Sequence, residues 1–234
     1  MTPLADCRLY AFVDTAYLHG RSPVELAKAL CDGGADLIQY RAKGHAGTDI
    51  RRVAAELLPV TTAAGVPLVI NDHWAIASEL GVPVCHLGQE DFFVAGLRHK
   101  RELPAPVGAP VSDPALRRAG RTAAGLEIGA PLLGLSSHAP DQARRALAAG
   151  ADYLAVGPVF PTGTKPGRPA VTLDYVRWAA ANVTIPWFAI GGITLENLEA
   201  VLAAGATRIC VVSAILNATD VARACAEFRR RLPA

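Results

Sequence analysis

The chain has 234 residues, of which 51% are hydrophobic, so it is long enough for one large domain with a fully buried core. Its 23 basic and 21 acidic residues are spread along the sequence, without the basic stripe that a nucleic-acid backbone requires. The first residues are too polar for a secretion signal, and no apolar run reaches the roughly 18 residues of a membrane span. We therefore expect one soluble, cytoplasmic domain, 1–234, with no nucleic-acid or membrane partner.

Eight short apolar runs are typical of strands that are buried on both faces of a sheet. In chain order they are Leu9–Val13, Leu37–Tyr40, Pro67–Ile70, Val84–Leu87, Pro131–Leu135, Tyr153–Val156, Trp187–Ile190 and Ile209–Val212. Segments rich in Ala, Leu, Arg and Glu lie between them and are typical of helices. The clearest are Pro23–Cys31, Ile50–Ala64, Asp141–Ala149, Leu195–Ala204 and Val221–Arg231.

This alternation of eight strands with helices predicts an α/β fold, a single (β/α)8 barrel of the TIM type. An open doubly wound sheet is the less favoured alternative, because it usually has fewer strands and often a glycine-rich turn after the first one. Segment 92–130, between the fourth and fifth strands, is too long for one helix and two loops and is interpreted as an insertion. The five cysteines show no Cys-x-x-Cys spacing, so we expect free thiols and no zinc.

In a barrel of this kind, reactive groups belong at the carboxyl ends of the strands. The second strand ends in Gln39-Tyr40-Arg41-Ala42-Lys43, where period-two spacing places Gln39, Arg41 and Lys43 on one face. The alternative is that Arg41 and Lys43 are the solvated start of a loop. Gln39 argues against it, because an amide inside an apolar run needs partners.

Asp72 and Asp91 follow the third and fourth strands and can meet across adjacent loops. Carboxylates suit Mg²⁺, which usually takes one or two of them and completes its shell with substrate phosphates and water. Each Asp could instead cap a helix. Since Arg41 and Lys43 can hold phosphate oxygens beside them, a metal–diphosphate site is the favoured interpretation.

The remaining strand ends also carry polar groups. Ser136 lacks an evident base for a nucleophilic role, so it is expected to hydrogen-bond a ligand, and His138 is left unassigned. The loop 157–167, with its Thr-x-Thr-Lys centre, could close over a phosphorylated ligand or be a solvated turn. Gly191-Gly192 and Val212-Ser213 follow strands seven and eight, the usual phosphate site of this fold.

The joint order of these motifs closely resembles the thiamine-phosphate synthase family. The motifs are Gln39-x-Arg41-x-Lys43, Ile70-Asn71-Asp72, His86-Leu87-Gly88-Gln89-Glu90-Asp91, Gly134-x-Ser136-x-His138, Gly157-Pro158-Val159-Phe160-x-Thr162-x-Thr164-Lys165, Gly191-Gly192-Ile193 and Val212-Ser213. The resemblance implies a transferase that joins a pyrimidine diphosphate to a thiazole phosphate, with Mg²⁺ as cofactor and loss of pyrophosphate. Segment 92–130 departs from the family pattern, and whether the protein forms a homo-oligomer is left open.

The resemblance also implies a role for each site residue. The pyrimidine diphosphate would be bound by Gln39, Tyr40, Arg41, Ala42, Lys43, Asn71, Ser136 and Lys165. Mg²⁺ would be held by Asp72 and Asp91, and the thiazole phosphate by Thr162, Gly163, Thr164, Gly192, Val212 and Ser213. Catalysis would fall to Arg41, Lys43, Lys165 and Ser136.

Two other functions are consistent with the same barrel. A thiazole tautomerase, a close relative, uses no diphosphate and would not need the cations and carboxylates. A catalytically silent barrel would bind phosphorylated ligands, or a protein partner through segment 92–130. A turnover assay separates the silent barrel from both enzymes.

Lys165 distinguishes the synthase from the tautomerase. In a synthase its contact with diphosphate should strengthen as the carbon–oxygen bond breaks, so Lys165→Ala should lower kcat by about 10²-fold or more. Lys165→Arg should restore only part of the rate, because a planar fork does not reproduce a point charge. Steady-state kinetics test this, and a raised KM with an unchanged synthase kcat would contradict it.

Overall fold

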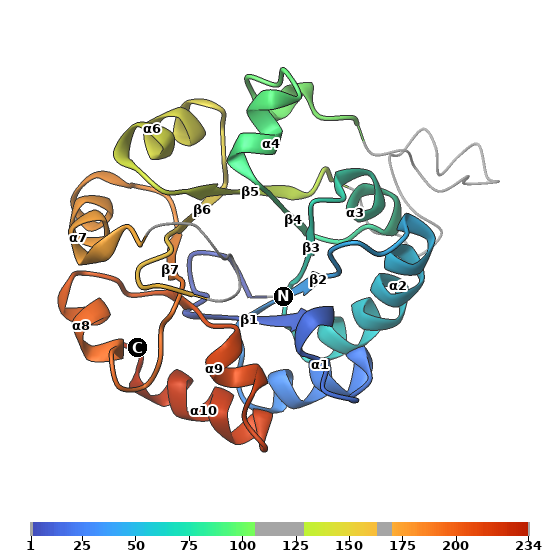
Figure 1. The fold of residues 1–234 in the computed structure, drawn as a ribbon. Coiled ribbons are helices and arrows are strands. Elements are labelled where there is room, and N and C mark those ends of the chain that lie inside the picture. The colour runs from blue at the N-terminus through green and yellow to red at the C-terminus, as the bar shows by residue number, and fades with distance from the viewer. Residues whose placement is uncertain (1, 106–128, 163–169, 234) are drawn as a thin grey trace.

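The computed structural model describes residues 2–105, 129–162 and 170–233. Eight parallel strands close into one barrel in the order of the chain, β1 to β8 (Figure 1). Their bounds are β1 Leu9–Asp14, β2 Leu37–Arg41, β3 Leu68–Asn71, β4 Val84–Leu87, β5 Leu132–Ser137, β6 Tyr153–Val156, β7 Trp187–Ile190 and β8 Ile209–Cys210. The predicted (β/α)8 fold is confirmed.

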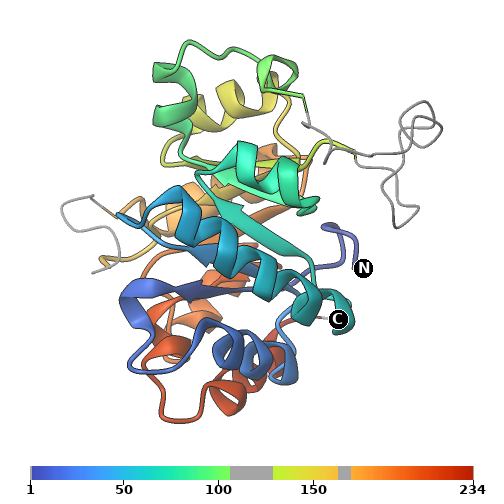
Figure 2. The same ribbon diagram turned by 90° about the vertical axis from the view of Figure 1, so that its right-hand side faces the viewer.

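Helices surround the barrel on its outer side (Figure 1). They are α1 Pro23–Asp32, α2 Gly47–Ala63, α3 Trp74–Leu80, α4 Gln89–Val94, α6 Pro140–Ala148, α7 Thr172–Asn182, α8 Leu198–Ala203, α9 Ser213–Leu216 and α10 Val221–Arg231, with 3₁₀ turns at Thr15–Tyr17 and Lys100–Glu102. The side view in Figure 2 places both termini at one end of the barrel. No helix in the described ranges is long and apolar enough to cross a membrane.

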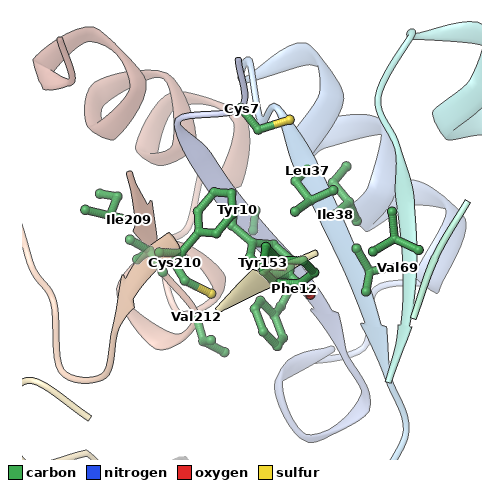
Figure 3. Packing of buried hydrophobic residues seen from close by; sticks show 14 of the residues in the cluster. Cys7, Tyr10, Phe12, Leu37, Ile38, Val69, Tyr153, Ile209, Cys210 and Val212 are labelled. Atoms are coloured by element: carbon green, nitrogen blue, oxygen red, sulfur yellow. The ribbon is translucent and has the colours of Figure 1, made fainter. Parts of the chain in front are cut away.

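The barrel interior is filled by side chains that alternate along each strand. Tyr10 of β1 packs against Phe12, Tyr153 and Phe188, with ring centroids 5.4, 6.0 and 5.2 Å away. Figure 3 shows the rings of Tyr10, Phe12 and Tyr153 together. Gly134 of β5 lies beside Tyr153 in the neighbouring strand, and a Cβ at Gly134 would overlap the tyrosine ring. The glycine is therefore required for Tyr153 to point inward.

The start of the predicted insertion packs against the barrel helices. Helix α4 begins at Gln89, before the expected boundary, and is followed by a 3₁₀ turn. The indole of Trp74 in α3 donates a hydrogen bond of 2.9 Å to the Pro104 carbonyl, and the Lys100 N–H donates to the carbonyl of Ala149 after α6. The rest of the segment, 106–128, lies outside the described residues.

The amino ends of the strands are tied together by Asp36. Its Oδ2 accepts hydrogen bonds from the backbone N–H groups of Arg8 and Leu9, at 2.8 and 2.9 Å, and lies 3.1 Å from Nε of Arg229 in α10. One carboxylate thus joins β1, the start of β2 and the last helix. It lies at the end of the barrel opposite the carboxyl ends of the strands, so its role is in stability.

Asp36→Ala should lower the free energy of unfolding by about 1–3 kcal/mol, because two backbone N–H groups lose a charged acceptor. The matched control is Asp174→Ala, which removes an exposed ion pair with Arg177 and should cost no more than about 1 kcal/mol. Urea denaturation of both variants measures the difference. Equal losses would contradict the structural role of Asp36.

Candidate active site

Two adjoining pockets open at the carboxyl ends of the strands. The charged pocket is lined by Arg41, Lys43, Asn71, Asp72, His86, Gly88, Glu90, Asp91, Ser136 and His138. The glycine-rich pocket is lined by His86, Ser136, His138, Ala155, Gly157, Pro158, Thr162, Ile190, Gly191, Gly192, Ile193, Cys210, Val211, Val212 and Ser213. His86, Ser136 and His138 belong to both pockets and mark their junction.

Arg41 is held in place by a carboxylate that the sequence analysis did not assign. Its Nη1 donates to Oδ2 of Asp14 at 2.7 Å, and the Asp14 side chain is only 1% exposed. The other Asp14 oxygen accepts from the N–H of Ala16 at 3.0 Å. Asp14 and Arg41 are register partners on β1 and β2, so the pair follows directly from the strand alignment.

Lys43 and Asp72 form the second ion pair of the charged pocket, at 2.8 Å. This pair is more open, because the two side chains are 58% and 30% exposed. Asp72 has a positive φ of 66°, a conformation that Asp and Asn adopt more readily than other non-glycine residues. The Asp72 N–H donates to the His86 carbonyl at 2.8 Å, which fixes this turn against β4.

Asp91 lies on the first turn of α4, and a Cβ at Gly88 would come 2.5 Å from its Oδ2. Neither Asp72 nor Asp91 caps a helix: the N-cap positions of α3 and α4 are His73 and Gly88. The capping alternative therefore does not account for these two carboxylates. Both face the same pocket as Arg41 and Lys43.

The other site residues predicted in and after the second strand point alternately to the inside and the outside of the barrel. Gln39 is 2% exposed and points into the barrel, where its amide donates to the Tyr10 hydroxyl. Tyr40 and Ala42 are buried and line neither pocket. Burial raises the pKa of the Tyr40 hydroxyl, and the charged groups acting on it belong to α2. The Tyr40 side chain thus faces the outer helix layer.

The remaining predicted residues lie around the two pockets. Asn71 lines the charged pocket, and Ser136 lies at the junction, where its Oγ accepts from the N–H of Gln89 at 3.2 Å. Thr162, Gly192, Val212 and Ser213 all line the glycine-rich pocket. Gly163, Thr164 and Lys165 lie outside the described residues.

The two histidines of the junction are held by their Nδ1 atoms. His138 Nδ1 hydrogen-bonds the Gly157 carbonyl, and its backbone N–H donates to Oε1 of Gln142 at 2.8 Å. His86 Nδ1 lies 3.0 Å from the Tyr153 hydroxyl. The sequence analysis included His86 in a family motif but predicted no role for it. The feature that could have indicated a site residue is its inward position on β4, beside Asn71 in β3.

The fold and the site together define a barrel enzyme that acts on small molecules. A model of the thiamine monophosphate synthase family matches residues 9–124 and 121–215. Thiamine-phosphate synthase from Thermus thermophilus is 43% identical over 201 residues, covering 86% of this chain and 84% of the relative. The enzyme of that name from Acidothermus cellulolyticus is 41% identical over 233 residues, covering 99% and 97%.

The similarity extends to solved structures. Thiamine phosphate pyrophosphorylase from Pyrococcus furiosus matches with a TM-score of 0.72 and 27% identity, over 96% of this chain and 94% of that one. The chain belongs to the thiamine monophosphate synthase family and is a transferase.

Asp14→Asn should lower kcat/KM by about tenfold, because the amide preserves the shape but removes the charge that fixes Arg41. Asp36→Asn, at the opposite end of the barrel, is the matched control and should leave kcat/KM unchanged. Steady-state kinetics and thermal unfolding are measured on both variants. A folded Asp14→Asn protein with wild-type kcat/KM would show that the ion pair does not position Arg41 for turnover.

Proposed function

We propose that this enzyme condenses 4-amino-2-methyl-5-(diphosphooxymethyl)pyrimidine with 4-methyl-5-(2-phosphoethyl)thiazole to give thiamine phosphate and pyrophosphate. The observation that carries the proposal is the pair of adjoining pockets. The charged pocket suits a diphosphate with its metal, and the glycine-rich pocket suits a second, phosphorylated substrate. Their shared wall brings the two reacting centres together.

In the proposed reaction the pyrimidine-methyl carbon–oxygen bond breaks first, and its electron pair leaves with pyrophosphate. Arg41, Lys43 and Lys165 stabilise the negative charge that builds up on the leaving group. The lone pair of the thiazole nitrogen then forms the new carbon–nitrogen bond with the pyrimidine-methyl cation. No protein nucleophile takes part, so the chain contributes positioning and electrostatic stabilisation.

The remaining proposed roles concern orientation. Asn71 orients the aminopyrimidine in the charged pocket, and Ser136 hydrogen-bonds the diphosphate substrate at the junction. Thr162, Gly192, Val212 and Ser213 line the glycine-rich pocket, which would take the thiazole phosphate. Gly163 and Thr164 are proposed to bind the same phosphate. Tyr40 and Ala42 line neither pocket, and their proposed contact with the substrate would be through the backbone because their side chains are buried.

The charged pocket fits Mg²⁺ as the proposed cofactor. Among the described residues, no group of three or more His, Cys, Asp or Glu side chains could hold a metal by itself. Two carboxylates, Asp72 and Asp91, are the number that Mg²⁺ takes when substrate phosphates and water complete its shell. The bound ion would supply neutralisation of charge on the diphosphate. A cytoplasmic location remains part of the proposal.

The decisive assay mixes the purified protein with both substrates and Mg²⁺ and measures thiamine phosphate and pyrophosphate. Equal amounts of the two products are expected. Isomerisation of the thiazole phosphate without thiamine phosphate would assign the tautomerase function instead. No turnover of either kind would favour a silent binding barrel.

Asp72→Asn and Asp91→Asn should each lower Mg²⁺-dependent turnover by about 10²-fold, because a neutral amide is a poor magnesium ligand. The fold should survive at Asp72, since Asn also tolerates a positive φ. Glu90→Gln is the matched control, because Glu90 lines the same pocket but has no proposed metal role. Turnover is measured across a Mg²⁺ titration. Wild-type metal dependence in both Asp variants would refute the metal assignment.

A further inference from the structure

A chain of hydrogen bonds crosses the barrel interior beneath the two pockets. It begins at the amide of Gln39 in β2, which donates to the hydroxyl of Tyr10 in β1. The Tyr10 hydroxyl lies 3.0 Å from that of Tyr153 in β6, and the Tyr153 hydroxyl lies 3.0 Å from Nδ1 of His86 in β4. The four side chains are between 0% and 9% exposed, so the chain is buried along its length.

The surrounding packing leaves the two tyrosines little freedom. Gly134 provides the space for the Tyr153 ring, and Phe188 packs edge-on against both tyrosines, at 5.2 and 5.8 Å between ring centroids. Burial raises the pKa of both hydroxyls well above the usual value. Both tyrosines are therefore protonated at neutral pH, and each has one hydrogen to donate.

The donor at the start of the chain sets its direction. The Gln39 NH₂ group donates to Tyr10, and the other hydrogen-bond partner of this buried hydroxyl among the described residues is the Tyr153 oxygen. We therefore assign the Tyr10 hydrogen to the bond with Tyr153, because a buried hydroxyl that does not donate is costly. The Tyr153 hydrogen is then directed to His86 Nδ1. A neutral imidazole that accepts at Nδ1 carries its hydrogen on Nε2. The buried chain thus selects one of the two tautomers of His86.

We propose that His86 presents this Nε2–H group to an acceptor atom of the pyrimidine diphosphate at the junction of the pockets, and that Tyr153 and Tyr10 are positioning residues that fix its tautomer. His86 lines both pockets, at the junction where the proposed reaction would bring the two substrates together. The identity of the ligand rests on the proposed function. The tautomer itself is a property of the free protein.

The first test measures the tautomer without any substrate. Long-range ¹H–¹⁵N spectra of histidine-labelled protein distinguish Nδ1–H from Nε2–H, and a His86→Gln variant assigns the His86 signals. We expect Nε2–H in the wild type and loss of this preference in Tyr153→Phe, which keeps the ring and removes the donor. Wild-type spectra showing Nδ1–H, or a doubly protonated ring, would overturn the proposal.

Tyr175→Phe is the matched control for Tyr153→Phe. The Tyr175 hydroxyl also is hydrogen-bonded inside the protein, to Ser137 Oγ and the Ala139 carbonyl, but on the outer side of β5. Its removal should lower stability by a similar amount and leave the His86 spectrum unchanged. A change of the His86 tautomer that is equal in both variants would show a general packing effect and overturn the positioning role of Tyr153.

The second test is kinetic and asks whether the donor reaches the substrate. His86→Gln keeps an N–H donor near the Nε2 position, whereas His86→Leu removes it. We expect kcat/KM for the pyrimidine diphosphate to fall by about 10²-fold in His86→Leu and by about tenfold or less in His86→Gln. A folded His86→Leu protein with wild-type kcat/KM would overturn the contact.

The two tests separate this inference from the proposed function. If the wild-type protein makes no thiamine phosphate, the proposed function fails, and the spectra still decide the tautomer. If it does make thiamine phosphate but the spectra show Nδ1–H, the inference fails alone.

Discussion

The alignment of neighbouring parallel strands is the constraint on which the whole site depends. It sets inward side chains of adjacent strands at the same height, so that Asp14 meets Arg41, and Asn71 lies beside His86. The same register places Gly134 next to His86 on one side and Tyr153 on the other. A shift of one residue in any strand would turn its site residue outward, toward the helices. The register of the closed barrel therefore brings the site residues of different strands together.

Three layers can be distinguished along the barrel axis. Carboxylates such as Asp36 join backbone N–H groups where the strands begin. A middle layer of aromatic rings contains the hydrogen-bonded hydroxyls of Tyr10 and Tyr153, and the charged groups gather where the strands end. This middle layer is buried and lies between the strand starts and the pockets, and its hydroxyls link it to His86 at the junction.

The sequence predicted the strands well, since a strand buried on both faces is a continuous apolar run. Residues inside such runs were harder to interpret. Tyr153 has the appearance of a core residue, and only the three-dimensional register shows its hydroxyl bonded to His86. Asp14 was missed because a lone Asp at the end of a strand has no partner in the local sequence. Tyr40 was included because it lies within a motif, although alternation directs its side chain to α2. The short helices α3 and α4 offer too few turns for a periodic pattern.

Arg41 and Lys43, the cations that line the charged pocket among the described residues, are held in different ways, and the difference bears on how a diphosphate would bind. Arg41 is paired with a carboxylate that is 1% exposed, so this pair is fixed before any ligand arrives. Lys43 is paired with Asp72 in the open part of the pocket, where both groups are partly solvated and the pairing is weak. A metal ion on Asp72 would share the charge of the carboxylate that now pairs with Lys43. The proposed metal would therefore weaken this pair and allow Lys43 to turn toward phosphate oxygens, while Arg41 stays paired with Asp14. In the proposed reaction, the exposed ion pair would then couple metal binding to diphosphate binding, and the buried pair would keep Arg41 in position.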